Sequence, residues 1–324
     1  MIYNTFNSKT NILTITYLCD SANVSTSGYY SYIKAKKNPE SFMNKKEIQD
    51  KADFELILQA YKHRGFSKGR RGIRMCLLHK GILMNEKKIH RLMKKFNLQC
   101  PIRKANPNRR IMKALQTSAV ADNLLERRFE DFGPDFVYLT DISYLFYSST
   151  RQRAYISVIK DSFTKQIKSY VISKSLEEDF VLETVEILFS KYKNVMNTDA
   201  LIHSDQGAHY TSIRFRELLK YREIRQSMSR RGNCWDNAPQ ESFFGHMKDE
   251  IGDLKRIETF EELKDLINDY MDYYNNDRYQ YNLAKLSPNE YAEYYSTGVY
   301  PLKNIIEEPI EFKEKFQRVK ENLN

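Results

Sequence analysis

Three acidic residues stand where a carboxylate is costly unless it has a partner. Asp141 lies inside the apolar stretch Val137–Phe146, which we expect to be a strand covered on both faces. Asp205 directly follows the short apolar stretch Leu201–Ser204, and Glu241 lies in the first turns of a predicted helix. A buried carboxylate is destabilising unless it is paired or bound to a cation. The three acids are therefore candidates for one metal site.

Carboxylates on different elements are suited to phosphoryl transfer. Two Mg²⁺ ions (or Mn²⁺) about 4 Å apart take oxygen ligands, and they activate the attacking hydroxyl and stabilise the leaving oxygen. Each acid alone has an ordinary explanation: Asp141 as a satisfied core carboxylate, Asp205 as a turn former, Glu241 as an acid favoured near a helix N-terminus. Their order on a central strand, a strand end and a covering helix favours the metal site.

The elements that must position these acids follow from the pattern of residues 136–255. Three segments rich in β-branched and aromatic residues follow one another at hairpin spacing, and helical and short strand segments then alternate. Strands are predicted at 136–147, 153–160, 166–173, 200–203 and 224–228, and helices from a capping box at 175–178 to about 192, at 214–221 and from 237. This order predicts an α/β, ribonuclease-H-like core at 126–255, a mixed sheet flanked by helices.

The charge is concentrated in one part of the chain. The 52 Lys and Arg exceed the 42 Asp and Glu, which gives a net charge of +10. Residues 60–115 hold 17 basic residues and one acid, Glu86, so that this segment carries 17 − 1 = +16 and the rest 10 − 16 = −6. A solvated helix face normally mixes both signs. Contact with the phosphates of a nucleic acid is the favoured explanation.

The basic segment also has the pattern of a helix-turn-helix. Helices are predicted at 46–61, at 70–79 and from a cap at Asn85, so that residues 45–98 form a DNA-binding domain. A small helical bundle with a solvated basic rim is the alternative. The expected DNA contacts on the third helix are Lys87, Lys88, Arg91 and Lys94. Residues 100–125 are predicted to be a linker, in which Arg109 and Arg110 follow a nucleic-acid backbone.

The two ends of the chain are predicted to be helical. In residues 1–40 we expect a short helix at about 12–22 and a turn at Ser25–Gly28. Residues 256–324 form a C-terminal extension, in which Thr259 and Glu262 open a helix and residues 301–324 are a peripheral helix or tail.

The composition excludes several classes of protein. The 41% of hydrophobic residues suffices for a sizeable core, and no apolar run reaches the ~18 residues of a membrane span. The N-terminus lacks the features of a signal peptide. The four cysteines fit neither a disulfide framework nor a zinc site, so we expect reduced thiols in a cytosolic protein.

Three motifs resemble those of a known family. The stretches Thr140–Tyr144, His203–Ser212 and Asn237–Phe244 resemble the integrase cores of bacterial insertion-sequence transposases, most closely the second-frame product of the insertion-sequence 3 family. The resemblance covers most of the chain, including residues 25–30, 45–98, 273–279 and 286–291. Thirty-five residues separate Asp205 from Glu241, as in the D-D-E triad of that family. The family's basic residue seven positions after the glutamate corresponds to Lys248, on the same helix face as Glu241.

The resemblance implies the reaction and the partners. It implies that Asp141, Asp205 and Glu241 hold two Mg²⁺ or Mn²⁺ ions, that one strand is cut at the element end, and that the freed 3′-hydroxyl attacks another phosphodiester. The implied partners are the terminal inverted repeats, target DNA, further copies of the chain and a fusion segment from an upstream frame. The implied location is the bacterial cytoplasm, at the nucleoid, without a membrane partner.

Several residues near the triad have two explanations each. His203 orients the site or is a core histidine, and His209 and Asn237 contact substrate or only cap and turn the chain. Trp235 stacks on an unpaired base or packs under its loop. Arg230 and Arg231, which precede that loop, are expected to follow a phosphate backbone.

Two other functions are compatible with parts of this pattern. A DNA-binding regulator whose α/β domain serves only assembly would explain the basic segment but not the three acids. A ribonuclease-H-like nuclease without strand transfer would use the same fold and the same ions. Only the family resemblance favours a transposase over this nuclease.

Overall fold

The computed structural model describes most of the chain in two compact units. The described residues are 2–8, 11–37, 39–100, 123–125, 131–229 and 237–322, and the side chains of 35 and 39–44 are left out. The chain divides into Met1–Leu58 and Gln59–Asn324. The finer division of the chain that the sequence predicts stays a prediction.

The first unit is helical. It contains α1 (Ile2–Phe6), α2 (Ile15–Ser21), α3 (Thr26–Lys37) and the larger part of α4 (Pro39–Lys62). The turn predicted at Ser25–Gly28 is wrong, because Thr26 begins α3 and the connection from α2 comes earlier, at residues 22–25. A Ser-Thr-Ser run opens a helix here because a hydroxyl can accept the hydrogen bonds of the first turn: Ser25 Oγ accepts from the Gly28 amide (3.1 Å).

The second unit begins with the end of α4, followed by a pair of short helices. The helices α5 (Arg70–His79) and α6 (Glu86–Lys95) are joined by a turn that contains Gly81, with φ of 75°. Asn85 caps α6 as predicted, since its Oδ1 accepts a hydrogen bond from the Lys87 amide (2.8 Å). The apolar spacing thus predicted both helices correctly.

A five-stranded mixed sheet follows, in the order β3-β2-β1-β4-β5. Its strands are β1 (Val137–Tyr147), β2 (Gln152–Asp161), β3 (Ile167–Ser173), β4 (Leu201–Ser204) and β5 (Arg225–Met228). The first three strands are antiparallel neighbours, whereas β4 pairs parallel with both β1 and β5. This is the predicted ribonuclease-H-like topology.

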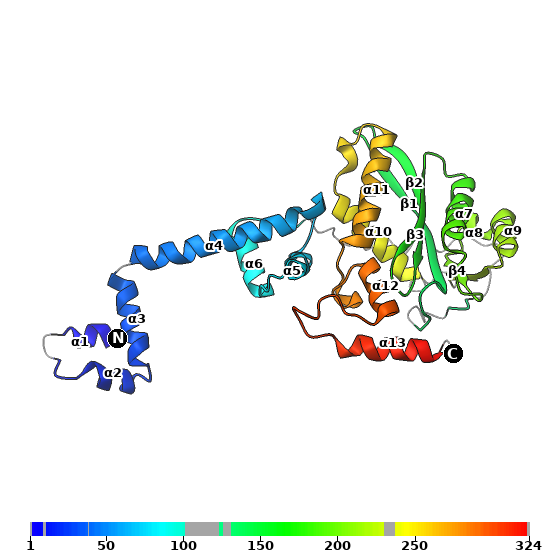
Figure 1. The fold of residues 1–324 in the computed structure, drawn as a ribbon. Coiled ribbons are helices and arrows are strands. Elements are labelled where there is room, and N and C mark those ends of the chain that lie inside the picture. Colours follow the sequence, from blue (N-terminus) through cyan, green and yellow to red (C-terminus); the bar gives the residue numbers. More distant parts are fainter. Residues whose placement is uncertain are drawn as a thin grey trace. The chain divides into compact units, whose positions relative to one another are not determined.

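Helices cover both faces of the sheet (Figure 1). On one face, α7 (Asp179–Tyr192) and α9 (Ile213–Tyr221) pack on side chains such as Tyr155 and Ile159 of β2. On the other face, α10 (Ala238–Ile251) and α11 (Phe260–Asn276) pack on Ile156 and Val158 of the same strand. Successive residues of a strand face opposite sides, so β2 contributes to both cores.

Of the two predicted capping boxes, one forms. Thr259 and Glu262 cap α11 reciprocally, as predicted. The box predicted at residues 175–178 is wrong: α7 begins at Asp179, and Ser175 Oγ instead accepts the hydrogen bond of the Glu177 amide (3.2 Å) in the preceding turn. A hydroxyl followed by acids suits a turn as well as a cap.

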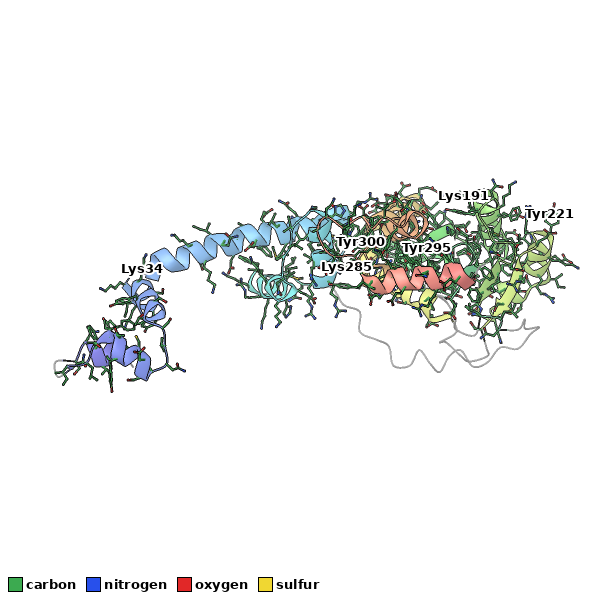
Figure 2. All side chains as sticks on the ribbon, turned by 60° about the horizontal axis from the view of Figure 1, so that its bottom comes forward. Lys34, Lys191, Tyr221, Lys285, Tyr295 and Tyr300 are labelled. Carbon is green, nitrogen blue, oxygen red and sulfur yellow. The ribbon has the colours of Figure 1, made fainter. Side chains whose placement is uncertain are left out.

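The C-terminal extension is packed onto the rest of the second unit. Besides α11, it contains α12 (Pro288–Thr297) and α13 (Ile310–Asn322). From α13, Phe316 contacts Tyr291 and Tyr295 of α12 and Phe163, which follows β2; Figure 2 shows Tyr295 beside α13. Residues 310–322 are thus a helix with a buried face, and not a tail.

The sequence predicts that the chain has no membrane-spanning helix and that its cysteines are reduced. No helix in the described part of the chain is both long and apolar enough to cross a membrane. The three described cysteines, Cys19, Cys76 and Cys100, form no disulfide within the described residues, and burial raises the pKa of Cys76 to about 11. Cys234 lies outside the described residues.

Candidate active site

The parallel pairing of β1 with β4 brings Asp141, on β1, and Asp205, directly after β4, to equivalent positions. Leu139 is the partner of His203 in this ladder, an offset of 203 − 139 = 64 residues. The same offset relates Asp141 to Asp205, one residue beyond the end of β4. Neighbouring strands lie about 5 Å apart, so the backbones of these two acids are close.

A buried tyrosine, Tyr210, senses the charges of both aspartates. It belongs to the short helix α8 (Ala208–Thr211), is 1% exposed, and its hydroxyl lies 3.4 Å from Thr140 Oγ1. Burial raises the pKa of Tyr210 well above its usual value, and the charges of Asp141 and Asp205 raise it further. Both carboxylates therefore lie within electrostatic range of this phenol, which the sequence pattern did not indicate.

The two aspartates are held by local hydrogen bonds. Asp141 Oδ1 accepts from the Ile142 amide (2.8 Å), and Asp205 Oδ1 accepts from the Gly207 amide (2.9 Å). A Cβ on residue 207 would lie 2.9 Å from Asp205 Oδ1, so a side chain there would displace this carboxylate oxygen. Asp141 is only half-buried. The expectation that its strand is covered on both faces is wrong, because β1 alternates buried and exposed residues from Ser143 on.

Gln240, next to Glu241, fixes the start of α10 on the sheet. Its side chain is fully buried, and Nε2 donates to the carbonyls of Leu139 and Val158, both at 3.1 Å. Val158 is the cross-strand partner of Asp141 in β2. Gln240 thus sets the position of Glu241 relative to β1.

Lys160 of β2 holds the same end of α10. It is 2% exposed, its Nζ donates to the Pro239 carbonyl (2.6 Å), and it lies 5.4 Å from the centre of the Phe243 ring. Burial lowers the pKa of Lys160 well below its usual value, and the nearby cations Lys165 and Arg278 lower it further. An ammonium in this position costs stability when it is charged.

The stability of the protein relative to a Lys160→Met variant is therefore expected to rise with pH. The relevant pH range lies between the lowered pKa of Lys160 in the folded protein and 10.5, the usual pKa of lysine. In this range Lys160 is protonated in the unfolded chain but neutral in the folded chain. The free energy of unfolding then increases with pH, by at most about 1.4 kcal/mol per pH unit. Urea unfolding of both proteins between neutral and alkaline pH measures this difference, and a pH-independent difference would contradict it.

A buried ion pair fixes the other end of α10. Arg278 donates to both carboxylate oxygens of Glu250 (2.7–3.0 Å), and Glu250 Oε2 also accepts from the Tyr270 hydroxyl (3.1 Å). Burial lowers the pKa of Arg278, but the charge of Glu250 outweighs this and the pKa is raised. The backbone carbonyl of Glu250 accepts from the Ser67 amide (3.3 Å), which joins α10 to the segment before α5.

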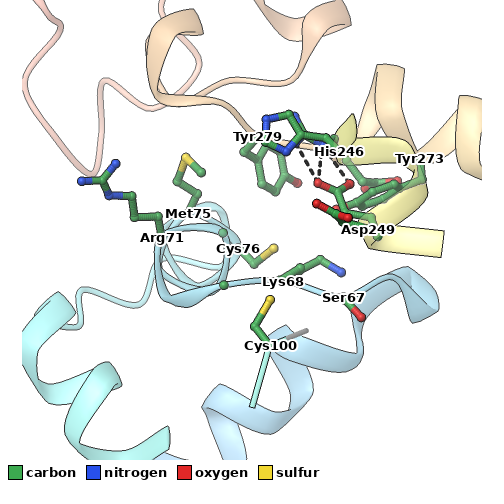
Figure 3. Close-up of a pocket in the computed structure, with 15 residues that line it drawn as sticks. Ser67, Lys68, Arg71, Met75, Cys76, Cys100, His246, Asp249, Tyr273 and Tyr279 are labelled. Carbon is green, nitrogen blue, oxygen red and sulfur yellow. Dashed lines mark hydrogen bonds and ion pairs between the residues drawn. The ribbon is translucent and has the colours of Figure 1, made fainter. Parts of the chain in front are cut away.

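A cavity of about 340 Å³ lies beside this ion pair (Figure 3). Figure 3 shows Lys68, Cys76 and Cys100 on the side of α5, with His246 and Asp249 of α10 opposite them. Lys68 Nζ donates to the Phe66 carbonyl (2.9 Å) and to that of His63. The wall of this cavity thus connects the segment before α5 to the helix that carries Glu241.

The carboxylates suit a hard cation by their donor type and by the elements that carry them. Asp141 lies on β1 and Asp205 directly follows the neighbouring β4, and α10 with Glu241 is anchored to the same part of β1. Within the described ranges, however, no three His, Cys, Asp or Glu side chains are grouped as a metal ion would require. The meeting of the three carboxylates on a pair of ions therefore stays a prediction.

Comparisons with known proteins assign the chain to a family. The Integrase core domain family matches residues 131–234 and, in a second model, 241–294, and the HTH-like domain family matches 47–106. The chain is 31% identical to the putative transposase InsK for insertion sequence element IS150 of Escherichia coli K12, over 85% of this chain and 92% of that protein. This chain belongs to the insertion-sequence 3 family of transposases. It is thus a DNA transposase with a polynucleotidyl-transferase core.

Other relatives of the transposase agree with this assignment. It is 34% identical to an uncharacterized transposase-like protein of Haemophilus influenzae, over 66% of this chain and 95% of that protein. It is 28% identical to the IS600 uncharacterized 31 kDa protein of Shigella sonnei, over 86% and 98%. Among solved structures, the HTLV-2 integrase catalytic core domain in complex with magnesium matches with a TM-score of 0.37 and 16% identity, over 49% of this chain and 97% of that one.

Two predicted supporting residues of the transposase are tied into its interior. His203 is fully buried, and its ring nitrogens lie 2.9 Å from Ser227 Oγ and 3.2 Å from Ser229 Oγ, as expected for a core histidine. His209 Nε2 lies 2.7 Å from the Leu176 carbonyl, which ties α8 to the segment before α7. Their partners are thus protein groups.

Asn237, the residue before α10, is different. It is 2% exposed, and both polar atoms of its side chain are buried without a hydrogen-bond partner within the described part of the transposase. Lys248 lies on α10 two turns after Glu241 and is half-buried. A substrate contact by either residue remains a prediction.

The predicted DNA contacts are only partly described. Lys87, Arg91 and Lys94 are exposed on α6 and Lys88 is half-buried, as suits a helix that meets a polyanion. Arg109, Arg110, Arg230, Arg231 and Trp235 lie outside the described residues.

Proposed function

We propose that this transposase cuts and joins DNA at the ends of an insertion sequence, with Asp141, Asp205 and Glu241 as the ligands of two Mg²⁺ or Mn²⁺ ions. The observation that supports this most is the offset of 64 residues between β1 and β4, which gives Asp141 and Asp205 equivalent positions two residues beyond the last pair of the ladder. The anchoring of Gln240 to the carbonyls of Leu139 and Val158 supports the inclusion of Glu241.

The reaction needs no covalent link between DNA and protein. Water attacks a phosphodiester at the element end and frees a 3′-hydroxyl, which then displaces an alcohol from a second phosphodiester. When bound, the two cations supply activation of the attacking oxygen and charge stabilisation of the leaving oxygen. The protein supplies the rigid sheet that carries the two aspartates, and Lys248 faces a phosphate of the bound strand from the helix of Glu241.

The partners that we propose follow from the two matched domains. The basic side of α6 binds phosphates of the terminal repeats, and the integrase core engages the element end and the target DNA. Joining two ends requires at least two copies of the chain, and we propose a homo-oligomer on DNA in the bacterial cytoplasm. A fusion to a segment from an upstream frame remains part of this proposal.

A joining assay tests the function. Purified protein is incubated with labelled duplexes of the element end, together with Mg²⁺ or Mn²⁺, and the products are separated on a denaturing gel. Joined strands are the expected products. Cuts without joining would identify a nuclease, and retention of the DNA without either product would identify a regulator.

Gln240→Leu is expected to slow joining while the protein stays folded. The substitution keeps the side-chain volume but removes the donor to Leu139 and Val158, so that Glu241 is no longer held in position relative to Asp141. A misplacement by 1 Å costs about 100-fold in rate. The matched control is Ser242→Ala, at the exposed position after Glu241. Single-turnover joining rates measure the effect, and an unchanged rate for Gln240→Leu would contradict the positioning role.

A further inference from the structure

The first unit contains a helix-turn-helix of its own. It lies before the HTH-like domain match, which begins at residue 47. The helices α2 and α3 are joined by the four residues 22–25, and Figure 1 shows that the two helices run in clearly different directions. Asn23 has φ of 51°, and the Val24 amide donates to the Cys19 carbonyl (3.0 Å), which turns the chain sharply. Two helices that run in different directions and are joined by a short, sharp turn form the helix-turn-helix arrangement of DNA-binding proteins.

The inner face of α3 is fixed by packing within this unit. Tyr29 of α3 is 6% exposed, and Cys19 of α2 is fully buried. Burial raises the pKa of Tyr29, and the neighbouring Cys19, Tyr30 and Tyr3 raise it further. Lys36 Nζ also lies 3.9 Å from the centre of the Tyr3 ring of α1. The orientation of α3 about its own axis is therefore set.

Beside this packed face, α3 carries an exposed polar stripe, in which the Tyr30 ring also meets the Tyr29 ring edge-on (centroids 5.6 Å apart). Ser27, Tyr30, Ser31 and Lys34 follow one another at helical spacing i, i+3, i+4 and i+7. All four are exposed, Tyr30 by 58% of its surface, and Figure 2 shows Lys34 at this helix. Each can donate a hydrogen bond, and α3 contains no acidic residue.

We propose that α3 is a second DNA-recognition helix, which reads base edges in the major groove of the terminal repeats through Ser27, Tyr30, Ser31 and Lys34. In a helix-turn-helix, the N-terminal residues of the second helix contact the bases. Ser27, Tyr30 and Ser31 lie in the first two turns of α3, whereas Lys34, Lys36 and Lys37 place positive charge at its end. Duplex DNA fits this face better than a protein, because a face of hydroxyls and ammonium groups without an acid is suited to bases flanked by phosphates.

The proposal divides recognition between two helices. The exposed side of α6 is dominated by Lys and Arg, which bind phosphates without reading sequence, while the stripe of α3 has hydroxyls for base edges. Loss of an α3 contact should therefore reduce sequence preference, whereas loss of an α6 contact should weaken binding to every duplex. These two effects can be measured separately.

The test compares Tyr30→Ala with Tyr32→Ala in the full chain. Tyr32 is a matched control because it lies on the same helix and is 57% exposed. Residues two apart on a helix do not share a face, so Tyr32 points away from the stripe. Fluorescence anisotropy measures binding to a duplex of the DNA flanking the coding sequence and to a shuffled duplex, at several salt concentrations. No divalent cation is added, so that the result does not depend on the proposed catalytic residues.

For Tyr30→Ala, the ratio of the two affinities is expected to fall by about 5- to 100-fold, the range for one lost base contact. For Tyr32→Ala it should change less than twofold, and Lys94→Ala on α6 should weaken binding to both duplexes and lower its salt dependence. Equal losses for the two tyrosine variants, no loss for either, or a wild-type chain that does not distinguish the duplexes would overturn the proposal. Circular dichroism of each variant verifies that the helices persist.

Discussion

Asp141→Asn, Asp205→Asn and Glu241→Gln are each expected to reduce strand joining by at least about 10³-fold. Each amide keeps the shape of the side chain, and Asp205→Asn keeps an oxygen that can accept the hydrogen bond of the Gly207 amide. What is lost is the negative charge, which a divalent cation needs in its ligands. A 10³-fold effect corresponds to about 4 kcal/mol of transition-state stabilisation. Joining of labelled element-end DNA measures the rate.

The control variant is Asp199→Asn. Asp199 is an exposed aspartate just before β4, whereas Asp205 follows the other end of that strand. This control should join DNA at the wild-type rate, and all three triad variants should still bind the DNA in the absence of a divalent cation. Full joining by any triad variant would remove that residue from the proposed site.

Arg278→Met is expected to lower the free energy of unfolding by about 3–5 kcal/mol, because it leaves the carboxylate of Glu250 without its cation. Both side chains are 15% exposed, so water can compensate only in part. The remaining donor to Glu250 is the Tyr270 hydroxyl at 3.1 Å. Urea unfolding measures the loss. Joining should slow as well, because Glu250 lies on the helix that carries Glu241.

The double variant Arg278→Met/Glu250→Gln separates an ion-pair effect from a packing effect. Removing both charges eliminates the uncompensated carboxylate, so the double variant should be more stable than Arg278→Met alone. The exposed pair Lys264 and Glu261, in which Lys264 Nζ lies 3.4 Å from Glu261 Oε2, is the control. Lys264→Met should cost less than about 1 kcal/mol. A double variant as unstable as Arg278→Met would assign the loss to packing.

Local patterns in the sequence predicted the elements well. The helix at 70–79 and the cap at Asn85 follow from apolar spacing and one side chain that accepts a neighbouring amide. The strands follow from β-branched and aromatic runs, and their order gives the mixed sheet. Such patterns fail where a short motif has two uses, as for Ser175, which closes a turn instead of capping α7.

The placement of the site depends on residues far apart in the chain. The ladder of β1 with β4 aligns positions 64 apart, and Gln240 reaches Leu139 across about a hundred residues. The effect of both Asp141 and Asp205 on the pKa of Tyr210 depends on the same alignment. No local periodicity contains this information, because the register is chosen by the packing of both faces of the sheet.

The sequence by itself determined the family, the helices and strands, and which three acids to consider, because motifs and periodicity are properties of neighbouring residues. Only the tertiary structure decided that Asp141 is half-buried, that His203 is held between Ser227 and Ser229, and that Glu250 is paired with Arg278. The physical reason is that burial and hydrogen-bond partners are set by whichever distant segment packs against a residue.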